Sequence, residues 1–185
     1  SRGLGDVYKR QVDGTTNLIH DFRNSTLSLA LARKGVLTLG IIYHPYSDEI
    51  FVAERGKGAL LNGSPISVSK RQNFSECLIS IGTSPYYREL AKENFRIFEK
   101  VFTDCADIRR LGSAALELAY VAAGRIDAYF ERSLKPWDYA AGILFVEEAG
   151  GKVTDYKGNP VDITGNSDIV AGNQTIGEIL VEKYL

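Results

Sequence analysis

The sequence has few cysteines, no excess of either charge and no long apolar run. Its 185 residues include two cysteines, Cys77 and Cys105, and carry a formal net charge of −1. Two cysteines without CxxC spacing argue against a disulfide framework and a structural zinc site, and they fit the reducing cytoplasm. A nearly neutral chain without blocks of like charge argues against a nucleic-acid or membrane-surface protein. No apolar segment is long enough to span a bilayer, and no signal-peptide pattern opens the chain.

Common catalytic signatures are also missing. The chain contains no GxSxG, P-loop or GxGxxG pattern. His20 and His44 have no partner at metal-ligand spacing, so we assign both to structure or surface. The apolar fraction of 44% and the charged fraction of 24% are those of a soluble globular protein with one well-filled core.

The first eleven residues, SRGLGDVYKRQ, differ from the rest of the chain. They show no usable hydrophobic periodicity, and the pattern changes abruptly at Val12. We interpret residues 1–11 as a non-native leader without regular structure, because they offer no apolar face to bury. A natural surface arm is the alternative interpretation.

Residues from about 12 to 75 predict an antiparallel meander. Residues 25–33 alternate polar and apolar side chains, and 36–43 and 49–53 are short and rich in β-branched residues. Asn62-Gly63 is a strong signal for a tight turn between strands.

The remainder, from about 76 to 185, alternates strands with helices in the rhythm of an α/β lobe. The strands predicted there cover 77–82, 126–130 and 168–172, and the helices cover 87–101, 113–123, 136–149 and a segment from about 175. Pro136 suits the first turn of its helix, since its missing N–H would have no intrahelical acceptor there. We therefore expect one domain over 12–185, of mixed α+β or α/β class, with two lobes.

The segment Val12-Asp13-Gly14-Thr15-Thr16-Asn17 is the first candidate for chemistry. Asp-Gly favours a turn, and Thr-Thr-Asn is common in turns and helix caps. The same segment can also place a carboxylate beside a glycine loop that opens a helix. Free N–H groups at such an end can hold a phosphate, and a threonine hydroxyl can orient a water molecule.

Three other places have an ordinary and a functional interpretation. Asp138 follows Pro136 in the first turn of a predicted helix, where an aspartate complements the helix dipole but also stays ionised, as a metal ligand must. Gly112-Ser113 is either a simple helix start or an N-terminus that meets a ligand. Glu131 ends a predicted strand, where a solvated glutamate is ordinary.

The order of the motifs decides between these interpretations. VDGTTN, RRLGSAA, DAYFE, KPWDYAAG and EEAGG follow one another between Val12 and about Gly172. In this order they closely resemble the inositol monophosphatase family, and the pair DGTTN and WDxAAG is specific. The resemblance implies the layered αβαβα sandwich of the sugar phosphatases, here without its N-terminal helices.

The resemblance also implies a function. Family members hydrolyse inositol monophosphate or a similar polyol or sugar phosphate with bound Mg²⁺, which activates water and stabilises the leaving group. Fructose 1,6-bisphosphate, histidinol phosphate, adenosine 3′,5′-bisphosphate and NADP are alternative substrates within the family. A non-catalytic relative that acts with RNA-processing or transcription partners is the alternative of another class. The resemblance further suggests a cytoplasmic homodimer.

Carried over by motif, the resemblance assigns roles to single residues. Asp13 and Asp138 are expected to bind one Mg²⁺, and the carbonyl of Val12 to face another metal ion. Gly14 and Thr15 are expected to meet the phosphate through N–H groups, with the Thr15 hydroxyl positioning the attacking water. Asp13 and Thr15 are thus the expected catalytic residues. The residues expected to hold or surround the polyol hydroxyls are Asp13, Gly112, Ser113, Ala114, Glu131 and Asp138.

The chain departs from the family pattern upstream of Val12. The family motif Asp-Pro-Ile/Val-Asp-Gly-Thr places a bridging aspartate at position 10, where this chain has Arg10, followed by Gln11 in place of proline. Arginine cannot ligate a cation and repels it. The upstream glutamate of the family, and the acidic partner of Thr15, have no counterpart. We therefore expect a truncated chain that is itself inactive and has an uncovered apolar face, rather than a degenerate paralogue.

Overall fold

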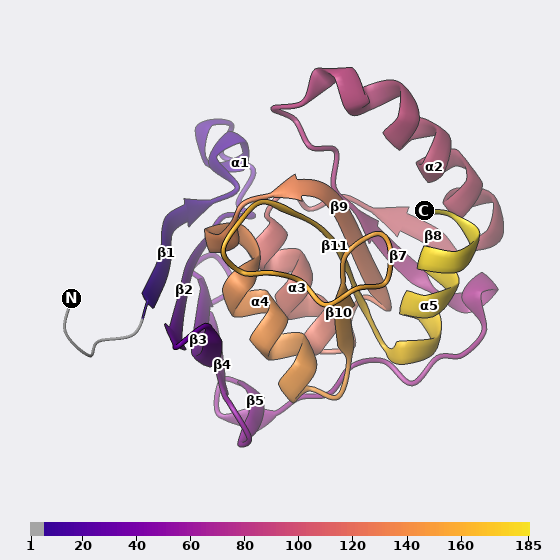
Figure 1. Cartoon of the computed structure of the whole chain (residues 1–185). Helices are drawn as coiled ribbons and strands as arrows, with labels where there is room; N and C mark the ends of the chain where they lie inside the picture. The colour runs from indigo at the N-terminus through magenta and orange to yellow at the C-terminus, as the bar shows by residue number, and fades with distance from the viewer. Residues whose placement is uncertain (1–5) are drawn as a thin grey trace.

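The computed structural model describes residues 6–185, which form two β-sheets and five α-helices (Figure 1). The first sheet is antiparallel and keeps the order of the chain. Its strands are β1 (Asp6–Asp13), β2 (Thr26–Arg33), β3 (Val36–His44), β4 (Glu49–Glu54), β5 (Gly58–Leu61) and β6 (Ser64–Pro65). This sheet confirms the predicted meander. Asn62 and Gly63 both have positive φ, 47° and 79°, as the tight turn between β5 and β6 requires.

The second sheet is mixed and has the order β10-β11-β9-β7-β8. Strand β7 runs parallel to β8 and β9, whereas β11 is antiparallel to both β9 and β10. The bounds are β7 (Leu78–Ile81), β8 (Asp107–Arg109), β9 (Ala128–Leu134), β10 (Lys152–Thr154) and β11 (Ser167–Gly172). The three-residue strand β8 was not predicted, because it is too short to show a period of two.

The helices lie close to their predicted positions. Their bounds are α1 (Thr15–Ile19), α2 (Ala91–Asp104), α3 (Ala114–Ala122), α4 (Pro136–Glu148) and α5 (Gln174–Lys183), with 3₁₀ turns η1 (Phe74–Glu76) and η2 (Arg88–Leu90). Within the described part of the chain, no helix combines the length and the apolar character needed to cross a bilayer. Both cysteines are free, with Cys77 buried and Cys105 half-buried.

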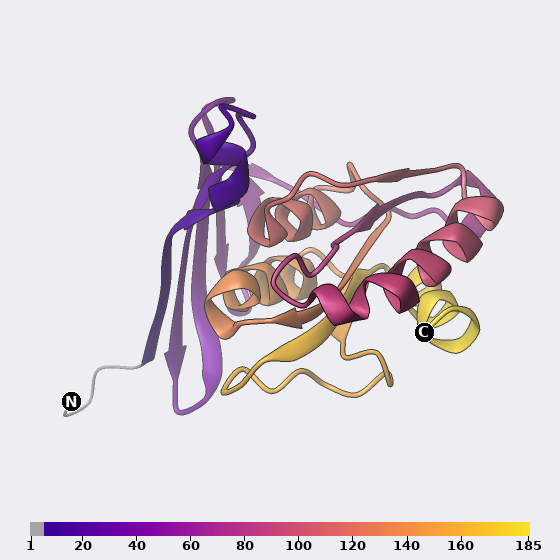
Figure 2. The ribbon, with the colours of Figure 1, turned by 90° about the horizontal axis from the view of Figure 1, so that it is seen from above.

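Helices α3 and α4 lie between the two sheets, and α2 and α5 cover the far side of the second sheet (Figures 1 and 2). Helix α4 is buried on nearly all sides, which explains why its sequence lacks a polar stripe. A Cβ atom on Gly142 would collide with Leu118, so this glycine lets α3 approach α4 closely. The layers read β-α-β-α, which agrees with the layered sandwich expected from the sequence.

One continuous core joins the two predicted lobes. It includes Ile42 and Phe51 from the first sheet, Leu118 from α3, and Tyr129 and Ile169 from the second sheet. The predicted boundary near residue 75 therefore marks a change of sheet, while both sheets share the buried helices.

The expectation that residues 1–11 lack regular structure is wrong for residues 6–11. These residues form most of β1, which pairs with β2 so that Val7 lies opposite Leu31 and Lys9 opposite Leu29. Pairing at a sheet edge is driven by backbone hydrogen bonds and needs no apolar face, which is why the composition did not predict it. The strand is nevertheless largely exposed, with 59% of Val7 accessible. Residues 1–5 lie outside the described residues.

The outer face of the first sheet is apolar and uncovered by the described residues. Leu29, Ile41 and Val52 lie side by side on β2, β3 and β4, and all three are half-buried. None of them belongs to the core between the sheets. No helix among residues 6–185 packs on this face (Figure 2). An uncovered apolar face is what the sequence predicts for this chain.

Candidate functional site

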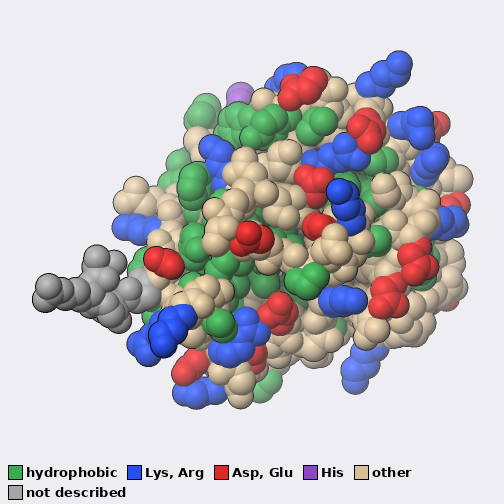
Figure 3. Space-filling view, in the orientation of Figure 1, with side chains coloured by type: hydrophobic (Ala, Val, Ile, Leu, Met, Phe, Trp, Pro, Cys, Tyr) green, Lys and Arg blue, Asp and Glu red, His purple; other side chains and the backbone are tan. Residues whose placement is uncertain are grey.

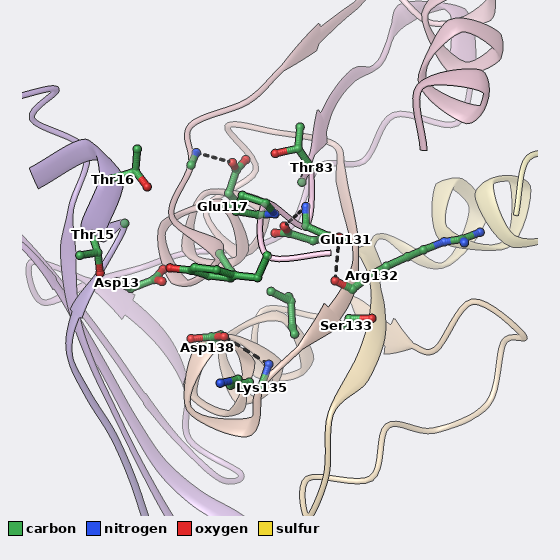
Figure 4. Close-up of a pocket in the computed structure, with 18 of the residues that line it drawn as sticks. Asp13, Thr15, Thr16, Thr83, Glu117, Glu131, Arg132, Ser133, Lys135 and Asp138 are labelled. Carbon is green, nitrogen blue, oxygen red and sulfur yellow. Dashed lines mark hydrogen bonds between the residues drawn. The ribbon is translucent and has the colours of Figure 1, made fainter. Parts of the chain in front are cut away.

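A cavity of about 440 Å³ lies where β1, α1, α3, β9 and α4 meet (Figure 4). It is lined by seven of the residues singled out in the sequence, namely Asp13, Gly14, Thr15, Gly112, Ala114, Glu131 and Asp138. The sequence motifs that lie far apart along the chain therefore surround one space. The opposite wall comes from the loop 82–87, which carries Thr83, Tyr86 and Tyr87.

Asp13 ends strand β1 and is only 4% exposed. Its Oδ2 atom accepts hydrogen bonds from the Ser113 hydroxyl at 2.6 Å and from the Ala115 N–H at 2.9 Å. Asp13 thus holds the start of α3. Ser113 caps α3, is buried, and is not among the residues that line the cavity, so its expected place beside the polyol stays a prediction. Its hydroxyl turns toward Asp13 because a buried carboxylate needs a donor.

Gly14 begins the short helix α1 in the left-handed conformation, with φ of 80°. A Cβ atom there would lie 2.8 Å from the Asn24 carbonyl oxygen, so only glycine fits this turn. Thr15 and Thr16 follow in the first turn of α1 and line the cavity. N–H groups in a first turn have no intrahelical acceptor, so they are available to a ligand.

Asp138 lies in the first turn of α4 and is buried. Its Oδ2 atom accepts a hydrogen bond from the Lys135 N–H at 3.2 Å. Burial raises the pKa of Asp138 above its usual range, although the nearby Arg10 guanidinium acts in the opposite direction. The sequence suggested that a place in the first turn keeps this carboxylate ionised, and desolvation outweighs that effect here.

Glu131 is buried, which contradicts the ordinary interpretation of a solvated glutamate. Its Oε1 atom accepts the Ser84 N–H at 2.8 Å, and its Oε2 atom accepts the Tyr129 hydroxyl. Burial raises the pKa of Glu131, while these two hydrogen bonds oppose the shift. Glu131 thereby joins β9 to the loop at the opposite wall of the cavity.

Arg10 contacts every expected metal ligand. Its guanidinium forms an ion pair with Asp13 at 3.2 Å and another with Asp138, and its Nε atom donates to the Val12 carbonyl at 3.1 Å. These contacts follow from the place of Arg10 on β1, three residues before Asp13. The side chain lies at the edge of the cavity, 20% exposed.

Glu117 also lines the cavity and was missed by motif reasoning. It is fully buried in α3, and burial raises its pKa to about 8. The signal that could have found it is a single charged residue in the otherwise apolar helix sequence AALELAY. Arg110, the second residue of the RRLGSAA motif, also lines the cavity, and its Nε atom donates to the Thr83 hydroxyl.

The molecular surface carries charges of both signs. Figure 3 shows lysines and arginines interspersed with aspartates and glutamates over the face in view. This distribution agrees with the formal net charge of −1 and forms no broad basic area on that face.

The sequence from Val12 onward matches a known family. The model of the inositol monophosphatase family covers residues 12–184. The chain belongs to the inositol monophosphatase family. The resemblance seen in the motifs is thereby confirmed, and residues from four of the five motifs, all but EEAGG, line the cavity described above.

Similar members of the inositol monophosphatase family carry different names. "Nus factor SuhB" of Salmonella typhimurium is 45% identical over 166 residues, which cover 89% of this chain and 61% of that protein. "Inositol-1-monophosphatase" of Mesorhizobium japonicum is 41% identical over 172 residues, covering 92% of this chain and 64% of that protein. An inositol monophosphatase structure from an Anabaena species is 40% identical with a TM-score of 0.89, covering 95% of this chain and 69% of that one. The chain thus spans less than two thirds of the curated relatives.

The inositol monophosphatase family is generally Mg²⁺-dependent, but the residues of this member do not fit the ion. Arg10 occupies the ligand atoms that are expected to face the metal. It forms ion pairs with Asp13 and Asp138 and donates a hydrogen bond to the Val12 carbonyl. In the described part of the chain, no three His, Cys, Asp or Glu residues form a group that could hold a metal ion. A guanidinium therefore takes the place that a cation would need.

Proposed function

We propose that this cavity binds inositol monophosphate or a similar polyol phosphate. The observation that supports the proposal is that Asp13, Glu131 and Asp138 line the same cavity as the Gly14–Thr15 turn. Carboxylates accept hydrogen bonds from polyol hydroxyls, and N–H groups of a helical first turn bind phosphate. One cavity thereby offers partners to both ends of such a ligand.

The phosphate is assigned to the N–H groups of Gly14 and Thr15, and the ring to the opposite wall. Glu131 and Asp138 lie across the cavity from Thr15, as Figure 4 shows. Burial raises the pKa values of both carboxylates because it removes water from them. Hydroxyl groups of a polyol would replace part of the lost hydration by donating hydrogen bonds.

We further propose that hydrolysis needs metal ligands that this chain lacks. With Arg10 bonded to Asp13 and Asp138, the 185-residue chain is expected to bind the ester and leave it intact. A form with Asp-Pro at positions 10 and 11 and an upstream glutamate segment is expected to hydrolyse the ester with Mg²⁺.

The experiment compares the present chain with a chimaera. The chimaera joins the N-terminal segment of the Mesorhizobium japonicum relative to Val12, and both proteins are assayed on inositol 1-phosphate across a Mg²⁺ series. Only the chimaera is expected to hydrolyse inositol 1-phosphate. The substitution Asp138→Asn in the chimaera is expected to abolish this hydrolysis. Mg²⁺-dependent turnover by the present chain would contradict the assignment of ligands.

A second candidate function is favoured by the relatives that are named Nus factor SuhB. In this role the chain would associate with transcription or RNA-processing partners and need no catalysis. A net charge of −1 argues against tight direct contact with RNA, so a protein partner is expected. Binding of purified RNA polymerase without any binding of inositol 1-phosphate would favour this role over the first.

We also propose that the whole protein is a cytoplasmic homodimer, as the family resemblance suggests. Light scattering on the chimaera is expected to give twice the mass of its single chain. A monomer at all concentrations tested would remove this part of the proposal.

A further inference from the structure

Glu117 bonds to the loop that precedes its own helix. Its Oε1 atom accepts the N–H of Leu111 at 2.7 Å and the N–H of Gly112 at 3.1 Å. Its Oε2 atom accepts the hydroxyl of Ser80 on β7. The side chain is 1% exposed and stands among apolar residues of α3. The three donors lie on strand β7 of the second sheet and in the loop that follows strand β8.

The same loop is held from its other side by Asn17. The Asn17 amide donates to the Leu111 carbonyl at 2.7 Å and to the Asn24 carbonyl at 2.9 Å. The peptide groups around Leu111 therefore have both N–H and C=O bonded to buried side chains. Burying a carboxylate costs free energy, so an apolar residue would suit α3 better if packing were its only task.

The loop so held is one wall of the cavity. Gly112 has φ of +81°, and a Cβ atom there would lie 3.0 Å from the Asn17 side chain. Gly112 and Ala114 both line the cavity. The Gly112 carbonyl oxygen also borders the Gly14 turn, 3.2 Å from the place that a Cβ atom on Gly14 would take. A shift of the Leu111–Gly112 backbone would change the distance between this wall and Glu131.

We propose that Glu117 is a positioning residue for the polyol part of the ligand, acting through the backbone of Leu111 and Gly112. The proposal rests on the proposed function and adds a residue to its machinery. Glu117 sets the place of the Gly112–Ala114 wall, which we assign to the ring, whereas the phosphate is assigned to the N–H groups of Gly14 and Thr15 on the neighbouring turn.

The hydrogen-bond pattern tolerates a proton on Glu117. A proton on Oε2 can be donated to the Ser80 hydroxyl, which in turn donates to the Arg109 carbonyl at 3.2 Å. Both backbone N–H groups stay on Oε1. Glu131 and Tyr129, both on β9, are ionisable groups that interact electrostatically with Glu117. Glutamine at 117 reproduces this protonated arrangement, because its amide nitrogen can donate to Ser80.

The test uses two ligands that report on different parts of the cavity. Binding of inositol 1-phosphate and of inorganic phosphate is measured by NMR titration of the present chain and its variants. Glu117→Ala is expected to weaken the binding of inositol 1-phosphate about tenfold, which corresponds to the loss of roughly one hydrogen bond. The affinity for inorganic phosphate is expected to stay unchanged. Glu117→Gln is expected to bind both ligands as the parent chain does.

A matched control is present on α4. Glu148 also accepts two backbone N–H groups, from Gly56 and Gly58 at 2.9 Å each, but it lies away from the cavity. Glu148→Ala is expected to leave both affinities unchanged. Hydrogen exchange at Leu111 and Gly112 is expected to accelerate in Glu117→Ala and to stay slow in Glu117→Gln and Glu148→Ala.

The outcomes separate the inference from the proposed function. If Glu117→Ala lowers the affinities for both ligands equally, or lowers neither, the positioning role is overturned and the proposed function still stands. A parent chain that binds neither ligand would overturn both. If the alanine variant does not fold, Glu117→Asp takes its place. The shorter side chain is expected to lose part of the inositol 1-phosphate affinity alone, and equal affinities would again overturn the role.

Discussion

At the residue scale, four carboxylates in one cavity differ in what they bond to. Asp13 and Asp138 contact the Arg10 guanidinium, whereas Glu117 and Glu131 are bonded to N–H groups and hydroxyls of the protein. An opposite charge stabilises the ionised form, and burial without one stabilises the neutral form. Burial nevertheless raises the pKa of Asp138, as it raises those of Glu117 and Glu131, so desolvation outweighs the nearby guanidinium at Asp138.

The stability of the chain is expected to depend on Glu117 above pH 4.5. Burial raises the pKa of Glu117 from 4.5 to about 8, so the folded chain keeps a proton that the unfolded chain releases. The stability from neutral Glu117 is complete below pH 4.5 and is lost as the pH rises to about 8. Relative to Glu117→Gln, the free energy of unfolding should fall by up to about 1.4 kcal/mol per pH unit in this window. Urea titrations at a series of pH values measure the difference, and parallel curves would refute it.

Because of Arg10, the stability of the fold is expected not to depend on Mg²⁺. Arg10→Ala leaves two buried carboxylates without a cation, which should cost on the order of 2 kcal/mol. Added Mg²⁺ should then raise the unfolding temperature of the variant and leave that of the parent chain unchanged. The control is Arg55→Ala, which removes an exposed pair with Glu147 and should cost less than about 1 kcal/mol without any response to Mg²⁺. Equal Mg²⁺ responses in the parent chain and Arg10→Ala would contradict the role of Arg10.

At the element scale, β2 separates a covered face from an uncovered one. Leu29 lies on the outer face beside Ile41, and Ala30 points into the core and is 1% exposed. Side chains alternate along a strand, so adjacent residues test opposite faces of the same sheet.

Leu29→Glu is expected to be tolerated and Ala30→Glu to unfold the chain. The first change places a charge in water and should shift the free energy of unfolding by about 1 kcal/mol or less, while reducing the binding of a hydrophobic dye. The second buries an unpaired charge between β2 and α4. Dye fluorescence and urea denaturation distinguish the two, and a strongly destabilised Leu29→Glu would show that the outer face is covered.

At the scale of the whole molecule, α3 and α4 link the two sheets into one folding unit. Phe51 of the first sheet packs against Tyr120 and Phe145, an arrangement that joins β4 to both central helices. Removing either sheet would expose the apolar residues of these helices. The lobes predicted from the sequence are therefore expected to unfold together.

Phe51→Ala is expected to lower the stability of the entire chain by roughly 3–5 kcal/mol, since it leaves a cavity in the shared core. Fluorescence of Trp137 on α4 and circular dichroism of the whole chain should show coincident transitions in the parent chain and the variant. Two separated transitions would show that the sheets unfold independently.

The sequence by itself determined the local elements and the family. Asn62-Gly63 specifies its turn through the conformations those residues favour, and Pro136 marks the start of α4 in the same way. The motifs from VDGTTN to KPWDYAAG were enough to group the residues around one cavity, because the resemblance already carries their spatial relation.

Only the tertiary structure decided which side chains meet. Contacts between distant parts of the chain could not be predicted. They include the pairing of residues 6–11 with β2, the hydrogen bond from Ser113 to Asp13, and the ion pair of Arg10 with Asp138. Glu117 shows the same limit, since its burial depends on β7 and on the loop at Leu111 rather than on its neighbours in α3. Hydrophobic period and turn chemistry act over a few residues, whereas burial and ion pairing depend on how the sheets and helices pack, and a single sequence does not contain that geometry.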